Sequence, residues 1–144
     1  MRLMGFNFKK ISAEKMSDVT KDVKLNANID ISSIEEIKSS IFRSKESLIG
    51  IKFSYILDYQ PNFAKIDFQG DLVLSMDSKL TRDVLKDWET KKMEEEFRIN
   101  LFNIILRKAG IRALDLENEL NIPLHQPMQQ FKKPDKEWVI FNHF

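Results

Sequence analysis

The feature that most constrains the fold of this chain is a strict alternation of apolar and polar residues in its first half. Between positions 23 and 31 every second residue is apolar. The same period of two recurs over residues 48–59 and residues 64–76, where β-branched and aromatic residues share one face. A period of two is typical of a β-strand with one buried and one wet face, whereas a helix repeats every 3.6 residues. The pattern therefore predicts three strands.

A shorter and weaker alternation near the N-terminus predicts a fourth strand. It includes Phe6 and Phe8, and we extend it to Ile11. Consecutive strands with short polar links favour an antiparallel sheet, because antiparallel neighbours need only a tight turn between them. Pro61 cannot continue a ladder of hydrogen bonds and marks such a turn. Gly70 interrupts the third alternating run, which predicts a bulge or a close approach of another backbone.

The second half of the chain predicts helices that cover the apolar face of this sheet. Asp77 or Ser78 can cap a helix that is established by Thr81. Gly110 is expected to end that helix, because glycine is common just past the last turn. A short second helix is expected over residues 114–120. The predicted fold class is therefore α+β, a four-stranded antiparallel sheet with a long C-terminal helix and a short second helix packed on one face.

The part of this helix between positions 97 and 106 is apolar on most of its circumference. Such a helix is buried on more than one side, and one sheet face covers only one side of it. We expect a second copy of the chain to cover the other side, since soluble proteins commonly form symmetric homo-oligomers. The alternative is that the C-terminal segment folds back over the helix. The residues assigned to the oligomer interface are Phe97, Leu101, Phe102 and Ile105.

Composition and charge exclude several classes of function. The 144 residues include 23 Lys and Arg against 22 Asp and Glu, so no basic excess indicates nucleic-acid binding. The chain has no Cys and only two His, which excludes disulfides, thiolate metal sites and a His-rich metal site. No apolar stretch is long enough for a signal peptide or a membrane span. We therefore expect a cytoplasmic protein without membrane insertion.

The length of the chain fits a single domain. We assign residues 1–131 to this domain and residues 132–144 to a polar linker and an apolar C-terminal tail. Such a tail would be sticky if it were exposed. We expect it to dock as an extra strand or into a partner.

Catalytic chemistry has no positive support in the sequence. There is no glycine-rich phosphate loop and no nucleophile elbow. No positioned nucleophile or carboxylate accompanies His125 or His143 in sequence, so both are interpreted as ordinary polar residues. Asp67 and Asp71 on one strand face, and the acidic run 94–96, are interpreted as solvated faces rather than cation sites. We predict no enzyme, no catalytic residue, no cofactor and no metal site.

Two passages give the chain a resemblance to a known family. Residues 63–72 (FAKIDFQGDL) form an alternating apolar run broken by a glycine, and residues 103–110 (NIILRKAG) precede a short apolar segment that ends in NIPL at 121–124. Together with four strands followed by helices, these passages resemble SecB, the bacterial protein-export chaperone, and its relatives. The resemblance covers about residues 1–128. The chain departs from the family in being neutral rather than acidic, which favours a general holdase or a relative that serves clients such as antitoxins over an export factor.

The resemblance implies an ATP-independent holdase that binds unfolded or extended polypeptides in apolar grooves of a homo-oligomer, either a dimer or a tetramer. The family's grooves lie between the first strands, the segment that links them and the second helix. They map onto nine apolar residues of this chain, for which ordinary core packing is the alternative: Phe6, Phe8, Ile11, Met16, Val19, Leu120, Ile122, Leu124 and Met128. Methionine suits such a groove because its side chain adapts its shape.

Two other classes of function remain open at this point. The first is an adaptor or structural subunit that binds one specific protein partner through the same apolar surfaces. The second is a small-molecule-binding or enzymatic domain, for which Gly70 and His125 are the only motivation.

Overall fold

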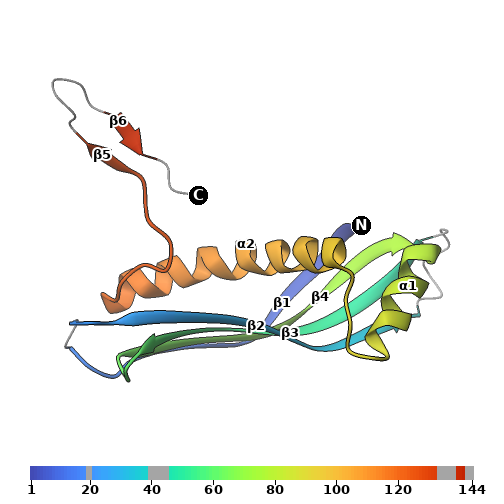
Figure 1. The fold of residues 1–144 in the computed structure, drawn as a ribbon, viewed down its shortest axis with the longest axis horizontal. Helices are drawn as coiled ribbons and strands as arrows, with labels where there is room; N and C mark the ends of the chain where they lie inside the picture. Colours follow the sequence, from blue (N-terminus) through green and yellow to red (C-terminus); the bar gives the residue numbers. More distant parts are fainter. Residues whose placement is uncertain (19–20, 39–45, 133–138, 142–144) are drawn as a thin grey trace.

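The computed structural model describes residues 1–18, 21–38, 46–132 and 139–141. The strands and helices labelled in Figure 1 follow one another along the chain as β1 (Arg2–Lys15), β2 (Lys24–Ile37), β3 (Glu46–Gln60), β4 (Ala64–Asp77), α1 (Ser78–Trp88), α2 (Glu95–Leu120), β5 (Gln130–Lys132) and β6 (Val139–Phe141). The first four strands form one antiparallel sheet in the described part of the chain, which confirms the predicted α+β class.

The strands of this sheet lie in the order β1-β4-β3-β2, so β1 and β2 are its edges. The alternation predicted for β3 and β4 is confirmed along their whole length, since Tyr55 pairs with Phe68 and Ile51 pairs with Leu72. The N-terminal strand is much longer than the sequence predicted and runs beside β4 for 14 residues.

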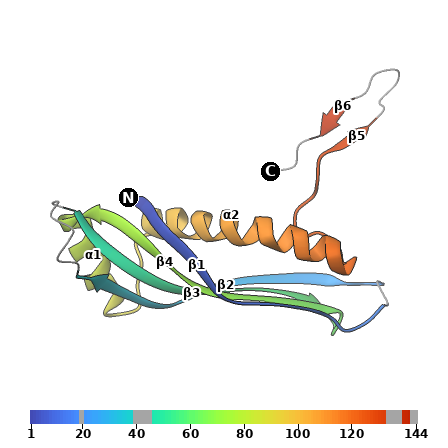
Figure 2. The same ribbon diagram turned by 180° about the vertical axis from the view of Figure 1, so that it is seen from behind.

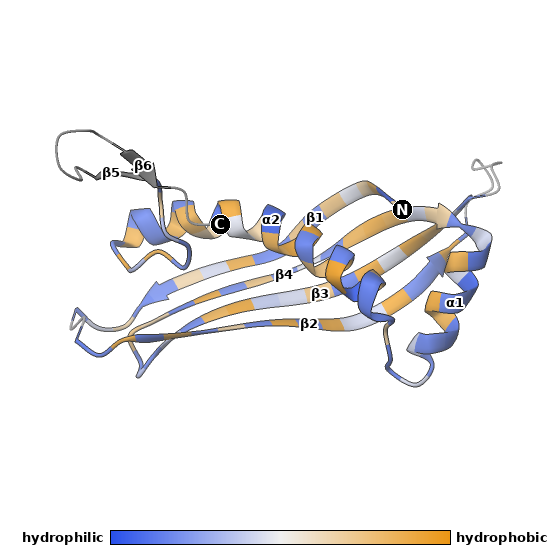
Figure 3. Ribbon diagram, turned by 45° about the horizontal axis from the view of Figure 1, so that its top comes forward, coloured by the Kyte–Doolittle hydropathy of each residue, from blue (hydrophilic) through white to orange (hydrophobic). Residues whose placement is uncertain are grey.

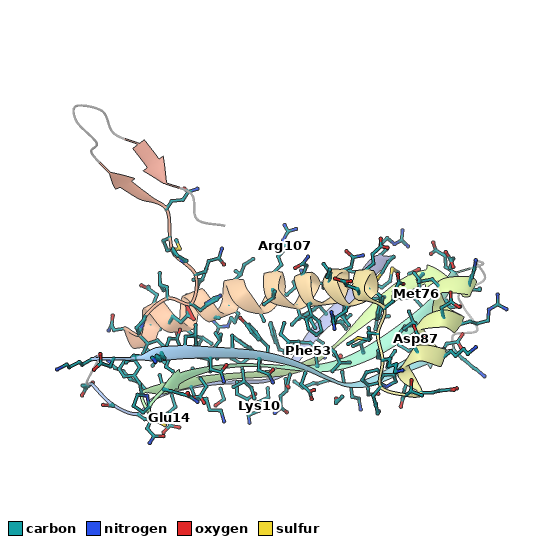
Figure 4. All side chains as sticks on the ribbon, in the orientation of Figure 1. Lys10, Glu14, Phe53, Met76, Asp87 and Arg107 are labelled. Carbon is teal, nitrogen blue, oxygen red and sulfur yellow. The ribbon has the colours of Figure 1, made fainter. Side chains whose placement is uncertain are left out.

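The helix α2 lies along one face of the sheet, as Figures 1 and 2 show from opposite sides of the molecule. Alternate residues of β3 and β4 point toward α2 and form the core. The hydropathy colouring in Figure 3 shows the same alternation along the strands. In Figure 4, Phe53 lies between the sheet and α2, Lys10 lies on the far side of the sheet, and Arg107 points away from it. The core is therefore a single layer between the sheet and the helix.

The helical part differs from the prediction. The first helix ends earlier than expected, and the second helix is longer than expected. Asp77 caps α1 by accepting a hydrogen bond from the Leu80 N–H at 2.7 Å. That helix ends at Trp88, where the polar link 89–94 begins. The single long helix that was expected is therefore two helices, with a break between Trp88 and Glu95. The short helix comes first and the long helix second.

The prediction that Gly110 ends a helix is wrong. Gly110 lies inside α2, is buried and has no positive φ angle. A Cβ at this position would lie 3.6 Å from Nε2 of His125, which is an ordinary van der Waals contact, so the segment after the helix packs beside Gly110 without requiring a glycine there. The helix ends at Leu120. The capping residue Asn121 has a left-handed φ angle of 55°, and the Ile122 N–H donates to the Glu117 carbonyl at 3.0 Å.

The close approach of another backbone that was predicted at Gly70 is confirmed, and the bulge lies in the neighbouring strand β1 rather than at the glycine itself. A Cβ on Gly70 would collide with the backbone oxygen of Asn7 and would lie 3.1 Å from the Phe53 ring. The register of β1 against β4 shifts between Phe8 and Lys10, directly opposite this glycine. A second shift lies in β2, opposite Phe53. Because Phe53 pairs with Gly70, both irregularities lie in one row across the sheet.

The strands β5 and β6 pair with each other and form a small hairpin that Figures 1 and 2 show away from the sheet. Residues 133–138 and 142–144 of the predicted linker and tail lie outside the described residues. The division of the chain at residue 131 stays a prediction.

Candidate polypeptide-binding surface

Phe6 and Phe8, which the sequence analysis assigned to a binding groove, pack against the hydrophobic core. Phe6 and Phe8 are half-buried on the face of β1 that looks toward α2. The ring centroid of Phe6 is 5.1 Å from that of Phe53, and the centroid of Phe8 is 5.4 Å from that of Phe68. At these distances the rings stabilise the sheet.

Ile11 and Met16, by contrast, are exposed at the other end of β1. The Met16 N–H donates a hydrogen bond of 2.7 Å to the carbonyl of Phe63, which leads the chain into β4. The next residue of the predicted groove, Val19, lies outside the described residues. Met16 therefore lies beside the turn between β3 and β4, whereas Ile11 lies farther along the sheet, opposite Phe68.

The segment after α2 supplies the remaining predicted groove residues. Leu124 and Met128 are exposed, Leu120 is half-buried, and Ile122 is only 5% exposed and belongs to the core. The burial of Ile122 corrects its assignment to an open groove. The structure brings Met16 and the segment after α2 to one end of the sheet, because Met16 bonds to Phe63, Phe63 packs against Tyr59, and Tyr59 bonds to Pro123.

A buried polar cluster holds the segment after α2 in place. Glu117 is fully buried and accepts hydrogen bonds from the His125 N–H at 3.0 Å and from the His125 ring Nδ1 at 2.8 Å. The Tyr59 hydroxyl lies 2.6 Å from the Pro123 carbonyl and 3.0 Å from Oε2 of Glu117. His125 therefore has a structural partner, and its role is to fix the segment rather than to start chemistry.

Burial raises the pKa of Tyr59 far above its usual range, and the negative charge of Glu117 adds to this effect. The pKa of Tyr55 is raised for the same two reasons. Sequence reasoning missed Glu117, although the signal was present. Glu117 continues the four-residue spacing of the buried residues Phe97, Leu101, Ile105, Ala109 and Ala113.

The predicted oligomer interface needs a correction. Phe97, Leu101 and Ile105 are buried against the sheet of their own chain, and only Phe102 is half-exposed. The apolar residues that α2 leaves exposed are Ile99, Leu106 and Ile111. The sequence showed correctly that this stretch is apolar on several sides, but it did not show which side meets the sheet.

One apolar hollow lies where sequence reasoning expected no site, between β2 and α2. It has a volume of about 320 Å³, and six residues line it: Ala27, Asn28, Ile29, Tyr55, Phe102 and Leu106. The alternation of β2 indicated which of its residues face the core, but it could not show that α2 leaves a gap beside them.

The acidic residues do not form a cation site in the described part of the chain, where no group of three or more metal-ligating side chains is present. Lys10 pairs with Asp67 at 3.1 Å, and Lys9 lies 3.8 Å from Asp71. These pairs lie on the face of the sheet away from α2. The interpretation of Asp67 as a solvated residue is wrong, because its side chain is only 14% exposed and its Oδ1 is buried without a hydrogen-bond partner among the described residues. No helix in the described residues is long and apolar enough to cross a membrane.

The arrangement of four antiparallel strands with the order β1-β4-β3-β2, followed by helices on one face, is a SecB-like fold. The structure is similar to that of the SecB-like chaperone Rv1957 of Mycobacterium tuberculosis, which was solved in complex with a ChAD peptide from the Rv1956 HigA1 antitoxin. The TM-score is 0.50 at 13% sequence identity, and the likeness covers 92% of this chain and 91% of that chain. No protein-family model and no curated protein sequence matches this chain. The likeness confirms the predicted fold.

Proposed function

We propose that this protein is an ATP-independent holdase that binds unfolded or extended segments of other polypeptides. The observation that carries this proposal is the number of apolar side chains left exposed around a SecB-like sheet. They include Met1, Met4, Ile11 and Met16 near β1, Leu25 in β2, and Leu124 and Met128 after α2. Both outer strands also offer a free edge in the described structure, and an extended chain can pair with such an edge.

The solved neighbour supports the same proposal, because Rv1957 is a chaperone that holds a peptide. Binding of this kind needs surface and hydrogen-bonding groups rather than a reacting side chain, so we propose no catalytic activity. The groove residues that remain in the proposal are the exposed ones, Ile11, Met16, Leu124 and Met128.

We further propose that the protein acts in the cytoplasm as a homo-oligomer. Ile99 is half exposed near the start of α2, and we assign it to the contact with a second copy. Exposed apolar residues on a helix favour such a contact.

The test is suppression of aggregation, measured by light scattering during dilution of several unrelated unfolded proteins. A holdase keeps each client in solution at a ratio near one oligomer per client. The double variant Ile11→Asp with Met16→Asp is expected to lose most of this effect, and circular dichroism checks that it is folded. Protection of a single protein alone would indicate the adaptor function, and no protection of any client would contradict the proposal.

A further inference from the structure

All the sulfur of this chain lies in its six methionines, since the chain has no Cys. Met76 is only 1% exposed and belongs to the core, and Met93 is half-buried against it. The other four methionines are about half exposed: Met1, Met4, Met16 and Met128. An oxidant in solution therefore reaches the sulfur atoms of these four before that of Met76.

Two of the exposed methionines lie in the surface that we propose for clients. Met16, which follows the end of β1, is 46% exposed, and Met128 after α2 is 54% exposed. Together with Ile11 and Leu124 they are the residues that remain in the proposed groove. Binding of an apolar segment by these side chains depends on the removal of apolar surface from water. The chemical state of the two sulfur atoms therefore affects how strongly this surface binds.

Oxidation of a methionine needs only a two-electron oxidant such as hydrogen peroxide. The thioether sulfur attacks one oxygen of the peroxide, the O–O bond breaks, and a sulfur–oxygen bond forms. The sulfur is oxidised, the peroxide is reduced, and the second oxygen leaves as water with both protons. The sulfoxide that results is polar and accepts hydrogen bonds from water, so its burial against an apolar segment is unfavourable.

Oxidation of these two side chains leaves the contacts that hold their backbones in place. The N–H of Met16 donates to the Phe63 carbonyl at 2.7 Å. The segment that carries Met128 is held by the hydrogen bonds of His125 to Glu117. Neither contact involves a methionine sulfur. The change therefore alters the surface without loss of the interactions that position it.

We infer that Met16 and Met128 are sites of reversible oxidation, and that their conversion to sulfoxides lowers the affinity of the protein for unfolded polypeptides. Methionine sulfoxide reductases return each sulfoxide to methionine, and the two epimers at sulfur need different enzymes. The apolar surface is then restored. This inference rests on the proposed function and adds a mode of regulation to its binding surface.

The test starts from the purified full chain, which is treated with hydrogen peroxide; catalase removes the peroxide before a client is added. Peptide mass spectrometry measures the sulfoxide at each methionine, and circular dichroism checks the fold. Affinity is measured by fluorescence anisotropy with labelled, reduced and carboxymethylated α-lactalbumin, which stays unfolded. We expect sulfoxide at Met16 and Met128 but not at Met76, and a loss of affinity of about fivefold or more. Treatment with both reductases is expected to restore the affinity.

Substitutions assign the effect to the two residues. The double variant Met16→Leu with Met128→Leu keeps apolar side chains of similar size, so it is expected to bind like the wild type and to keep this affinity after peroxide. The matched control Met4→Leu removes a methionine of nearly equal exposure near the start of β1 and is expected to lose affinity on oxidation as the wild type does. Met16→Gln with Met128→Gln introduces polar groups without oxidation and is expected to weaken binding as peroxide does.

Several outcomes would overturn the inference. Equal losses of affinity in the double leucine variant and the wild type would place the effect at another residue. Sulfoxide at Met76 together with a loss of the circular dichroism signal would show that oxidation acts by unfolding. If the untreated protein binds the client and a protein with both sulfoxides binds it equally well, only this inference fails. If the untreated protein binds no client, the proposed function fails and this inference fails with it.

Discussion

The carboxylate of Glu117 and the ring of His125, eight residues apart in sequence, meet at 2.8 Å under the end of α2. An ionised carboxylate only accepts hydrogen bonds, so Nδ1 of His125 carries the proton in this pair. The contact closes the segment after the helix against the core and leaves Leu124 exposed on its outer side. The position of part of the proposed binding surface thus depends on one buried side chain.

Removal of the Glu117 carboxylate is expected to be strongly destabilising. Glu117→Ala leaves the backbone N–H and the ring Nδ1 of His125 without their acceptor, whereas Tyr59 keeps the Pro123 carbonyl, and the change should lower the free energy of unfolding by about 3–5 kcal/mol. Glu117→Gln should lower it by less, because the amide oxygen still accepts one hydrogen bond. Urea denaturation measures both, with the exposed Glu119→Gln as control. A loss below 1 kcal/mol for Glu117→Ala would contradict the role of this cluster.

Stability is expected to fall at high pH because of Tyr59. The pKa of Tyr59 is higher in the folded chain than the ordinary value of 10.0, since burial and the charge of Glu117 oppose ionisation. The unfolded state therefore loses its proton first, so this stabilisation is complete below pH 10 and decreases as the pH rises further. Thermal denaturation between pH 8 and pH 11 measures the effect. Tyr59→Phe should reduce the slope above pH 10, and an unchanged slope would contradict this assignment.

Substitutions along α2 distinguish the side that meets the sheet from the side that faces outward. Leu101→Ala removes a side chain that is fully buried in its own chain and should cost about 2–5 kcal/mol of unfolding free energy. Leu106→Ala removes a side chain that is 42% exposed and should cost much less. Equal losses of unfolding free energy in the two variants would contradict this division of the helix. A change in solution mass with Leu101→Ala alone would indicate that Leu101 lies in an interface between two copies of the chain.

Gly70 is expected to tolerate no side chain. A Cβ would collide with the backbone of Asn7, which cannot move as freely as a side chain, so Gly70→Ala should cost about 1–3 kcal/mol or more. The matched control is Gly5→Ala, because a Cβ there meets no atom within 4 Å. Calorimetric melting of the two variants compares them, and equal melting temperatures would show that the sheet adapts at Gly70.

The sequence predicted the two central strands well and the two edge strands poorly, for a physical reason. β3 and β4 keep one period of two along their length, so every second residue faces the core. In β1 the residues that pack against the core change from Phe6 and Phe8 to Ala13, and in β2 they change from Ile31 to Ile34. Each change is caused by a register shift, which a pattern with a fixed period cannot contain.

The candidate site shows a similar limit. The apolar residues of the C-terminal half were identified correctly, but their division between core, groove and outer surface depends on where the chain breaks between α1 and α2. Helical periodicity gives relative angles within one helix, and the break resets those angles. The hollow beside Tyr55 depends on the distance between α2 and β2, for which the sequence carries no local signal.

The row of irregularities through Phe53 and Gly70 has a consequence for how the length of this chain can vary. Lys9 in β1 and Ser32 in β2 are each the extra residue of a register shift, so neither occupies a pairing position of its own. Deletion of either residue would leave every other side chain of its strand on the same face. The same deletion in β3 or β4 would turn the rest of that strand over and expose its core residues. Relatives of this protein should therefore gain or lose single residues at these two positions of the sheet, and keep the spacing of the central strands fixed.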